Sequence, residues 1–186
     1  MIGVLASGEG TNLQALIDAG LPIVAVASSR AEARALERAR VAGIPSAVFE
    51  LPQSSDRLEP VTAVRRARDS AMADWLDANG VRLVVLAGYM QLLTPAFLAR
   101  FPGAIVNVHP SLLPAFTGLR AIERAVEAGV AETGVTVHLV DEGIDTGPVL
   151  RQEPVPVEPR ATLVQRIHAV EHRLLPEVVS ELCRAH

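Results

Sequence analysis

The segment Asn107–Pro114, which reads Asn-Val-His-Pro-Ser-Leu-Leu-Pro, brings an amide and an imidazole together at the end of an apolar stretch. Asn107 and His109 are two residues apart, so in a strand their side chains share one face. An amide donor beside an imidazole can stabilise an oxyanion and move a proton. A structural role for His109 at the strand edge is the alternative that these residues alone leave open.

The segment Asp141–Pro148 holds three carboxylates in a loop that also contains two glycines. Such a loop can be a solvated turn, a metal-binding loop or the source of one catalytic carboxylate, and the EF-hand spacing is absent. A metal site built from His109, His138 and an aspartate is disfavoured, because no His-Glu-x-x-His or clustered His/Cys spacing accompanies it. We therefore expect no metal.

The segment Ser7–Asn12, Ser-Gly-Glu-Gly-Thr-Asn, lies between a predicted strand and a predicted helix. Glycines let backbone N–H groups approach an anion, and the dipole of the following helix favours negative charge. We expect a phosphate at Gly10, Thr11 and Asn12. The pattern is neither Gly-x-Gly-x-x-Gly nor a Walker sequence, so a dinucleotide or nucleoside triphosphate is not indicated. The alternative is a tight turn with Thr11 or Asn12 as helix cap.

Three further groups have a functional and a structural interpretation. His138 lies within a predicted strand, and we expect it to pack in or near the core. His168 and His172 are four residues apart on the last predicted helix, which suits a metal site or, more simply, a surface or interface pair. Tyr89 and Met90 follow an apolar strand, where they either line a pocket for a flat ring or pack in the core.

Apolar runs and turn residues predict the elements that position these groups. Strands are predicted at Ile2–Ala6, Leu21–Ala27, Ile44–Glu50, Val81–Ala87, Ala104–His109, Val135–Val140 and Pro148–Val157. Helices are predicted at Thr11–Ala19, Ala31–Val41, Pro60–Asn79, Ala121–Ala128 and Ala161–Arg184, with a loop at Leu51–Glu59. Pro176 predicts a kink or break in the last helix.

Strands separated by helices predict βαβ units. We expect an α/β fold, in which a single domain spanning residues 1–186 has a mostly parallel twisted sheet with helices on both faces. Ligands in such folds bind outside the carboxyl ends of the strands, where Ser7–Asn12, Asn107–Pro114 and Asp141–Pro148 are predicted to lie.

The composition of the 186 residues excludes several classes of function. All 17 basic residues are Arg, so Schiff-base chemistry on Lys, a P-loop Lys and a Lys general base are excluded. A net charge of −4 disfavours nucleic-acid binding. The single Cys183 permits no internal disulfide. Neither a signal peptide nor an apolar stretch long enough to span a membrane is present, so we expect a cytoplasmic protein that does not bind membranes.

Four segments together resemble a known family. Val4–Ala15, Leu86–Met90, Asn107–Pro114 and Asp141–Pro148 occur in the order and with the approximate gaps of the phosphoribosylglycinamide formyltransferases. These are folate-dependent formyltransferases of purine biosynthesis. The resemblance covers essentially the whole chain and implies a Rossmann-like formyltransferase fold. It divides the domain into a phosphate- and substrate-binding half, 1–100, and a catalytic and folate-binding half, 101–186.

The resemblance implies transfer of the formyl group of 10-formyltetrahydrofolate to the amine of glycinamide ribonucleotide. Asn107, His109 and Asp145 would be the catalytic group. Asn107 would donate its amide N–H to the oxyanion, and His109, as imidazolium, would stabilise the same charge or deliver a proton. Asp145 would pair with His109 and help to move the proton from the attacking amine to the leaving nitrogen.

The resemblance also implies binding roles. Gly10, Thr11 and Asn12 would hold the substrate phosphate, and Glu171 would bind the ribose hydroxyls. Residues expected at the folate are Arg65, which would face its glutamate tail, Met90, Gln91, Leu93, Val140, Asp141, Glu142, Gly143 and Ile144. The expected partners are small molecules, with no nucleic acid and no membrane, and a homodimer is left open.

The chain departs from the family pattern at four positions. Gln91 stands where an Arg is often found, Thr117 where a Pro is usual, Arg120 where a His is common, and His168 where some relatives have a Lys. These departures concern substrate contacts more than the class of reaction.

Three alternative functions remain to be weighed. Methionyl-tRNA formyltransferase shares Asp-Glu-Gly-x-Asp-Thr-Gly but needs a further domain and a basic surface for tRNA. Formyltetrahydrofolate deformylase uses the same catalytic residues with water as acceptor, but it usually carries an N-terminal regulatory domain, and here the first strand begins at Ile2. A non-catalytic nucleotide-binding module would not need Asn107, His109 and Asp145 together.

Overall fold

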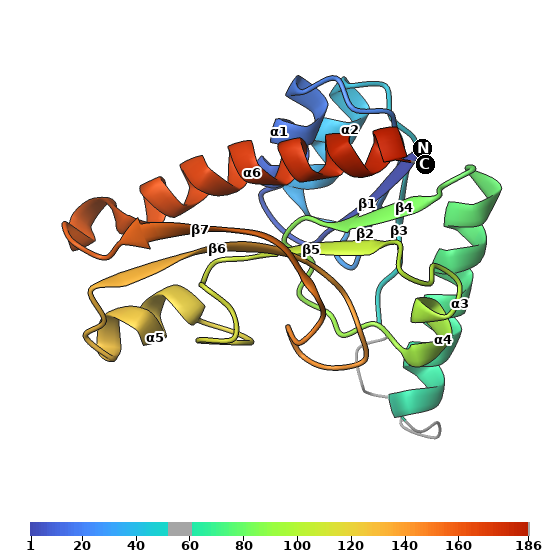
Figure 1. Cartoon of the computed structure of the whole chain (residues 1–186). Coiled ribbons are helices and arrows are strands. Elements are labelled where there is room, and N and C mark those ends of the chain that lie inside the picture. The colour runs from blue at the N-terminus through green and yellow to red at the C-terminus, as the bar shows by residue number, and fades with distance from the viewer. Residues whose placement is uncertain (52–60, 186) are drawn as a thin grey trace. The chain divides into compact units, whose positions relative to one another are not determined.

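The computed structural model describes residues 1–51 and 61–185. The chain forms two compact units, Met1–Ile105 and Val106–His186 (Figure 1). The predicted loop Leu51–Glu59 lies almost entirely outside the described residues.

Unit 1 contains a parallel four-stranded arrangement in the order β3-β2-β1-β4. Its strands are β1 (Ile2–Ala6), β2 (Ile23–Ser28), β3 (Ser46–Val48) and β4 (Leu83–Leu86). Every residue of β1 is buried, because it lies between β2 and β4 and is covered on both faces. The predicted strands and their parallel pairing in this part of the chain are confirmed.

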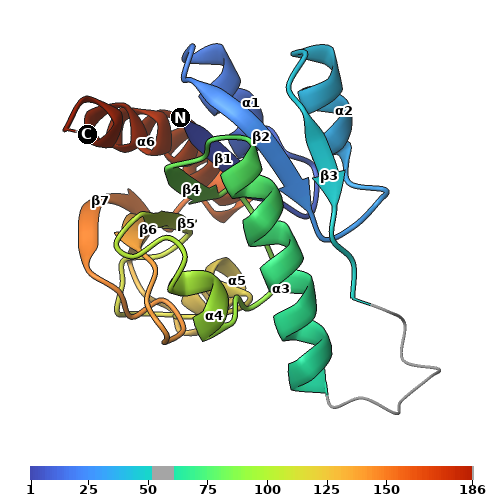
Figure 2. The same cartoon turned by 90° about the vertical axis from the view of Figure 1, so that its right-hand side faces the viewer.

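The helices of unit 1 are α1 (Thr11–Asp18), α2 (Arg34–Val41), α3 (Val61–Ala78) and the short α4 (Pro95–Leu98). The connections through α1 and α2 step from β1 to β2 to β3, and the connection through α3 returns past β1 to β4. Right-handed crossovers therefore place α3 on the face opposite to α1 and α2. Helix α4, which the sequence did not predict, packs beside α3 (Figure 2).

Gly3 permits the close packing of α3 on β1. A Cβ atom at Gly3 would lie 2.9 Å from the side chains of both Leu76 and Val81. Only a residue without a side chain lets these buried apolar groups cover the middle of the sheet.

Unit 2 has an antiparallel sheet in the order β5-β6-β7. Its elements are β5 (Ile105–His109, of which Ile105 belongs to unit 1), α5 (Ala121–Glu127), β6 (Glu132–Leu139), β7 (Val149–Pro156), η1 (Arg160–Thr162) and α6 (Leu163–Ala185). Strands β6 and β7 are joined by a loop with no helix, and parallel pairing would need a longer crossover. The sheet is mostly parallel in the chain as a whole, but the antiparallel part was not predicted.

Helix α6 runs along β6 and β7 and does not end at Pro176 (Figure 1). A proline inside a helix costs about 3 kcal/mol. Buried Leu174, Leu175, Val178 and Val179 lie on either side of it, and each contributes roughly 1.5–3 kcal/mol on burial. Packing therefore outweighs the lost hydrogen bond, and the predicted break is wrong.

A buried ion pair on α3 includes a carboxylate that also binds the segment before α4. Arg68 Nε lies 2.6 Å from Asp69 Oδ1, and the two side chains are 4% and 0% exposed. The other carboxylate oxygen, Oδ2, accepts a hydrogen bond of 2.6 Å from the backbone N–H of Thr94. Asp69 thus attaches the backbone at Thr94 to helix α3.

Replacing Arg68 by Met should leave the buried Asp69 carboxylate without its cation. Removing one partner of a buried pair typically costs about 3–5 kcal/mol, so we expect the free energy of unfolding in urea to fall by that amount. Arg82→Met, at an exposed position, is the matched control and should change it by less than about 0.5 kcal/mol. Equal losses in the two variants would show that the pair does not stabilise α3.

Candidate active site

The carboxylate of Asp145 lies at the centre of a polar cluster in unit 2. Strand β5 supplies Asn107 and His109, β6 supplies His138, and the loop between β6 and β7 supplies Asp145. The antiparallel register places Asn107 directly opposite His138. Directly opposed residues on one face of a sheet are in contact distance, so the pairing itself builds half of the cluster.

The distances make one connected network. Asp145 Oδ2 accepts a 2.7 Å hydrogen bond from the backbone N–H of Gly118 and lies 3.3 Å from His109 Nδ1. Asp145 Oδ1 accepts a 3.3 Å hydrogen bond from Asn107 Nδ2 and lies 3.6 Å from His138 Nε2. The predicted grouping of Asn107, His109 and Asp145 corresponds to these contacts.

Both ring nitrogens of His109 face acceptors. Nδ1 faces the Asp145 carboxylate, and Nε2 lies 2.9 Å from the backbone carbonyl oxygen of Phe116. The ring is 7% exposed. A neutral imidazole has one N–H and can donate to one of these two acceptors, whereas an imidazolium can donate to both.

His138 belongs to this cluster, although the sequence suggested only a core residue. Its Nδ1 lies 2.8 Å from the carbonyl oxygen of Leu139, and its Nε2 lies 3.1 Å from Asn107 Nδ2. Nε2 therefore lies between the Asn107 amide and the Asp145 carboxylate. The network thus turns the Asn107 NH₂ group toward His138 and Asp145. Only the cross-strand register, which the sequence does not reveal, could have indicated this role.

The environment of Asp145 favours its ionised form. Burial raises the pKa of this carboxyl, but hydrogen bonds from His138 and Gly118 and the charges of His109 and His138 outweigh burial. The net effect is a pKa below the usual range for aspartate. Asp145 is therefore a carboxylate at neutral pH.

Left-handed backbone conformations surround the cluster. Phe116, Arg120 and Asp145 have φ values of 54°, 57° and 54°, which cost non-glycine residues about 1–3 kcal/mol each. The turn at Phe116 directs its carbonyl toward His109. Arg124 holds the same turn, since it lies 5.9 Å above the Phe116 ring and donates a 2.5 Å hydrogen bond to the carbonyl of Thr117.

The loop between β6 and β7 is closed by its own hydrogen bonds. Asp141 Oδ1 accepts hydrogen bonds from the Gly143 N–H, at 3.0 Å, and from the Thr146 hydroxyl, at 2.7 Å. Ile144 is 54% exposed, and Glu142 is also exposed. Of the three carboxylates in this loop, Asp145 is the one that joins the cluster, while Asp141 shapes the turn.

The expected phosphate loop opens α1 in unit 1. Gly10 is the N-cap with φ 71° and no side-chain capping bond, so the alternative in which Thr11 or Asn12 caps the helix is wrong. A Cβ at Gly10 would lie 2.7 Å from Ala35 Cα. The first intrahelical bond runs from Gln14 N–H to the Gly10 carbonyl. The first-turn N–H groups therefore point out of the amino end of α1, as an anion site requires.

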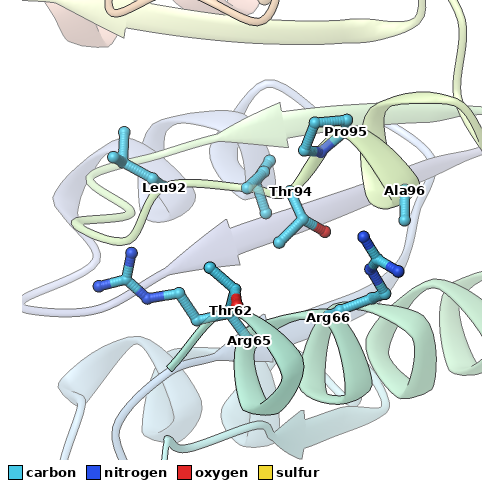
Figure 3. A pocket seen from close by; sticks show the side chains of 8 residues that line it. Thr62, Arg65, Arg66, Leu92, Thr94, Pro95 and Ala96 are labelled. Atoms are coloured by element: carbon cyan, nitrogen blue, oxygen red, sulfur yellow. The ribbon is translucent and has the colours of Figure 1, made fainter. Parts of the chain in front are cut away.

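The remaining predicted residues are placed within the two units as follows. In unit 1, Arg65 and Leu93 line a cavity of about 280 Å³ (Figure 3), Met90 is 65% exposed and Gln91 is half-buried. In unit 2, Glu171 is buried on α6 and Val140 begins the loop after β6.

Two structural features are absent from the described residues. Among residues 1–51 and 61–185, no group of three or more His, Cys, Asp or Glu is arranged to hold a metal ion. Within the same residues, no helix is both long and apolar enough to cross a membrane.

The fold and the cluster define a class of protein. An amide, an imidazole and an ionised carboxylate in contact are groups that can stabilise an oxyanion and move a proton. The family model described as Formyl transferase matches residues 1–179. The chain belongs to the formyl transferase family.

Relatives in this family share sequence and fold with the chain. Phosphoribosylglycinamide formyltransferase of Haemophilus influenzae is 44% identical over 187 residues, which cover 96% of this chain and 84% of the relative. The trifunctional purine biosynthetic protein adenosine-3 of Chironomus tentans is 43% identical, but the chain spans only 13% of its length. The crystal structure of glycinamide ribonucleotide transformylase 1 from Symbiobacterium toebii matches with a TM-score of 0.86 and 45% identity over 96% of this chain and 84% of that one.

These findings confirm the resemblance and the fold class that the four sequence segments predicted. The family match also implies a folate-type formyl donor.

The lowered pKa of Asp145 predicts how stability depends on pH. The folded state ionises this carboxyl more readily than the unfolded chain, so the stabilisation is present above the ordinary aspartate pKa. It is lost as the pH falls through the lowered pKa. Between about pH 4 and pH 2, the free energy of unfolding should therefore fall more steeply for the wild type than for Asp145→Asn. Urea titrations at pH values across this range measure the free energy of unfolding of both proteins.

Asp18→Asn, which removes an exposed carboxylate of α1, is the control for that experiment. Its free energy of unfolding should depend on pH in the same way as that of the wild type. Parallel curves for the wild type and Asp145→Asn would contradict the assigned environment of Asp145.

Proposed function

We propose that this protein transfers the formyl group of 10-formyltetrahydrofolate to the amine of glycinamide ribonucleotide. The observation that carries the proposal is the contact of Asn107, His109 and Asp145 within a chain of the formyl transferase family. The relatives' names supply the acceptor, and the residues in contact supply a chemistry that suits it.

The proposed reaction is a direct displacement. The acceptor amine attacks the formyl carbon and forms a C–N bond, which gives a tetrahedral carbon that bears an oxyanion. The bond from that carbon to N10 of the folate then breaks, and the proton lost by the attacking nitrogen ends on N10. The products are the formylated amine and tetrahydrofolate, and no covalent enzyme intermediate is required.

The cluster suits the charges that develop in this reaction. The imidazolium of His109 places positive charge beside the site and can stabilise the oxyanion. Asp145, ionised at neutral pH, balances that imidazolium and accepts the proton of the attacking amine, directly or through water. Asn107 donates to the oxyanion by giving up one of its two hydrogen bonds. The 3.3 Å bond to Asp145 is the longer and therefore the one exchanged.

Binding roles complete the proposal. Gly10, Thr11 and Asn12 hold the phosphate of the acceptor, and Glu171 binds its ribose hydroxyls. The folate-binding residues are Arg65, Met90, Gln91, Leu93, Val140, Asp141, Glu142, Gly143 and Ile144. Residues 1–100 then serve phosphate and substrate binding, and residues 101–186 serve catalysis and folate binding, within one formyltransferase domain.

One assay distinguishes the transferase from its alternatives. The protein is mixed with 10-formyltetrahydrofolate, with and without glycinamide ribonucleotide, and the release of tetrahydrofolate is followed. Release that depends on the acceptor is the expected result. Release without the acceptor would instead identify a deformylase, and no release in either mixture would identify a non-catalytic binding module.

Asn107→Ala should remove most of the activity. Loss of one oxyanion donor typically lowers kcat about 100- to 1000-fold, and we expect a loss in that range from steady-state kinetics. Gln165→Ala, which shortens an exposed amide on α6, is the matched control and should keep the wild-type kcat. Near-normal turnover of Asn107→Ala would overturn the proposed mechanism.

His138 acts through Asn107 and is therefore a positioning residue. His138→Phe keeps a buried ring but removes the ring nitrogen that contacts the Asn107 amide. Small displacements of a catalytic group cost up to about 100-fold, so we expect kcat to fall by roughly that factor while both KM values stay within about twofold. His138→Gln, whose amide can both donate and accept a hydrogen bond, should recover part of kcat. A purely structural role would lower the melting temperature without this rescue.

A further inference from the structure

A row of three opposed residues crosses the sheet of unit 2 beside the polar cluster. The register places His109 of β5 opposite Thr136 of β6, and Thr136 opposite Gln152 of β7. Directly opposed residues of antiparallel strands share a face, so all three side chains lie on one side of these neighbouring strands (Figure 1). Gln152 therefore lies on the same face as His109, although it is two strands away.

The loop between β5 and α5 returns over this face and is hydrogen-bonded to the row. Gln152 Nε2 donates to the carbonyl oxygen of Leu113, at 2.7 Å, and to the hydroxyl of Thr136, at 2.9 Å. The same hydroxyl donates to the carbonyl oxygen of Ser111, at 2.7 Å, and accepts from the Leu113 N–H, at 3.1 Å. Thr136 is buried, and the one proton and two lone pairs of its hydroxyl are all used. Both backbone polar groups of Leu113 are thus held by the row.

The held part of the loop leads directly to the group that faces His109. The Ser111 hydroxyl donates a 2.5 Å hydrogen bond to the carbonyl oxygen of Ala115, which closes the turn that follows Leu113. Phe116 comes next, and its carbonyl oxygen lies 2.9 Å from His109 Nε2. A displacement of Leu113 is therefore passed through a short hydrogen-bonded turn to the carbonyl that contacts the imidazole.

Apolar packing holds the same loop without help from Gln152. A Cβ atom at Gly134 would lie 2.8 Å from Leu112 Cγ, so the Leu112 side chain lies directly on the backbone of β6. The neighbouring Leu113 is buried. Gln152 itself is exposed, and one hydrogen-bonded amide at the surface adds little to the stability of the folded state. Its amide therefore adjusts the position of a loop that packing already keeps in place.

We propose that Gln152 is a positioning residue of the reaction, which acts on His109 through Leu113 and the Phe116 carbonyl. This inference rests on the proposed function, because it concerns the placement of the imidazole beside the oxyanion. A misplacement of about 1 Å at a reacting group can lower the rate about 100-fold. Gln152 touches neither the phosphate loop nor the residues proposed to bind folate in its printed hydrogen bonds, so its loss lowers kcat and leaves KM unchanged.

Gln152→Met tests the inference in the whole protein. Methionine is similar in length but has no N–H, so both hydrogen bonds are lost with little change in side-chain volume. We expect kcat for formyl transfer to fall about tenfold while both KM values stay within about twofold. The melting temperature should fall by no more than about 4 °C. Gln165→Met, the same change at an exposed amide of α6, is the matched control and should keep the wild-type kcat.

Nuclear magnetic resonance observes the His109 ring directly, without turnover. In protein labelled with ¹⁵N at histidine, the ring signals of His109 are assigned by their absence from His109→Gln. These signals should shift in Gln152→Met, because the acceptor at Nε2 moves, and should keep their positions in Gln165→Met. An unchanged kcat, a loss that is expressed in KM alone, or unshifted His109 signals in Gln152→Met would each overturn the inference.

The two measurements separate this inference from the proposed function. Shifted His109 signals in a protein whose wild type transfers no formyl group would overturn the proposed function but support the positioning of His109 by Gln152. Formyl transfer that Gln152→Met leaves unaffected would overturn the inference alone.

Discussion

The carboxylate of Asp145 is the constraint on which the arrangement of unit 2 depends. It accepts hydrogen bonds from Gly118 and Asn107 and faces both histidines of the cluster. A half-buried charge with four such neighbours is stable only if each holds its place, because a missing partner leaves the charge poorly solvated. The left-handed turns at Phe116 and Asp145 are therefore retained despite their cost, since they direct a carbonyl and the carboxylate to the two sides of His109.

The two histidines of the cluster have different hydrogen-bonding neighbours. His109 Nε2 faces the Phe116 carbonyl and its Nδ1 faces the Asp145 carboxylate, whereas His138 Nδ1 faces the Leu139 carbonyl and its Nε2 lies beside the Asn107 amide. Two residues of the same type thus have different functions because their backbone neighbours differ.

Unit 1 shows a parallel use of buried polarity. Asp69 fixes Thr94 and pairs with Arg68, so the segment that lines the cavity is attached to α3 by a charge-assisted contact as well as by apolar packing. Gly3 and Gly10 have no side chain, so neighbouring residues lie directly against their backbone. This close contact positions α3 and the amino end of α1. The contacts of Asp69 and the absence of side chains at Gly3 and Gly10 therefore shape the surfaces that are proposed to bind ligands.

The sequence by itself determined the α/β class, the strands of unit 1 and the segments that contain Asn107, His109 and Asp145. It did so because apolar periodicity and turn residues are local signals, and because the four family segments are contiguous in the chain. Only the tertiary structure decided that β6 and β7 pair antiparallel, that α6 continues through Pro176 and that His138 lies opposite Asn107. These outcomes depend on strand register and on packing between residues far apart in the chain. Such long-range contacts outweigh local propensity but leave no local pattern.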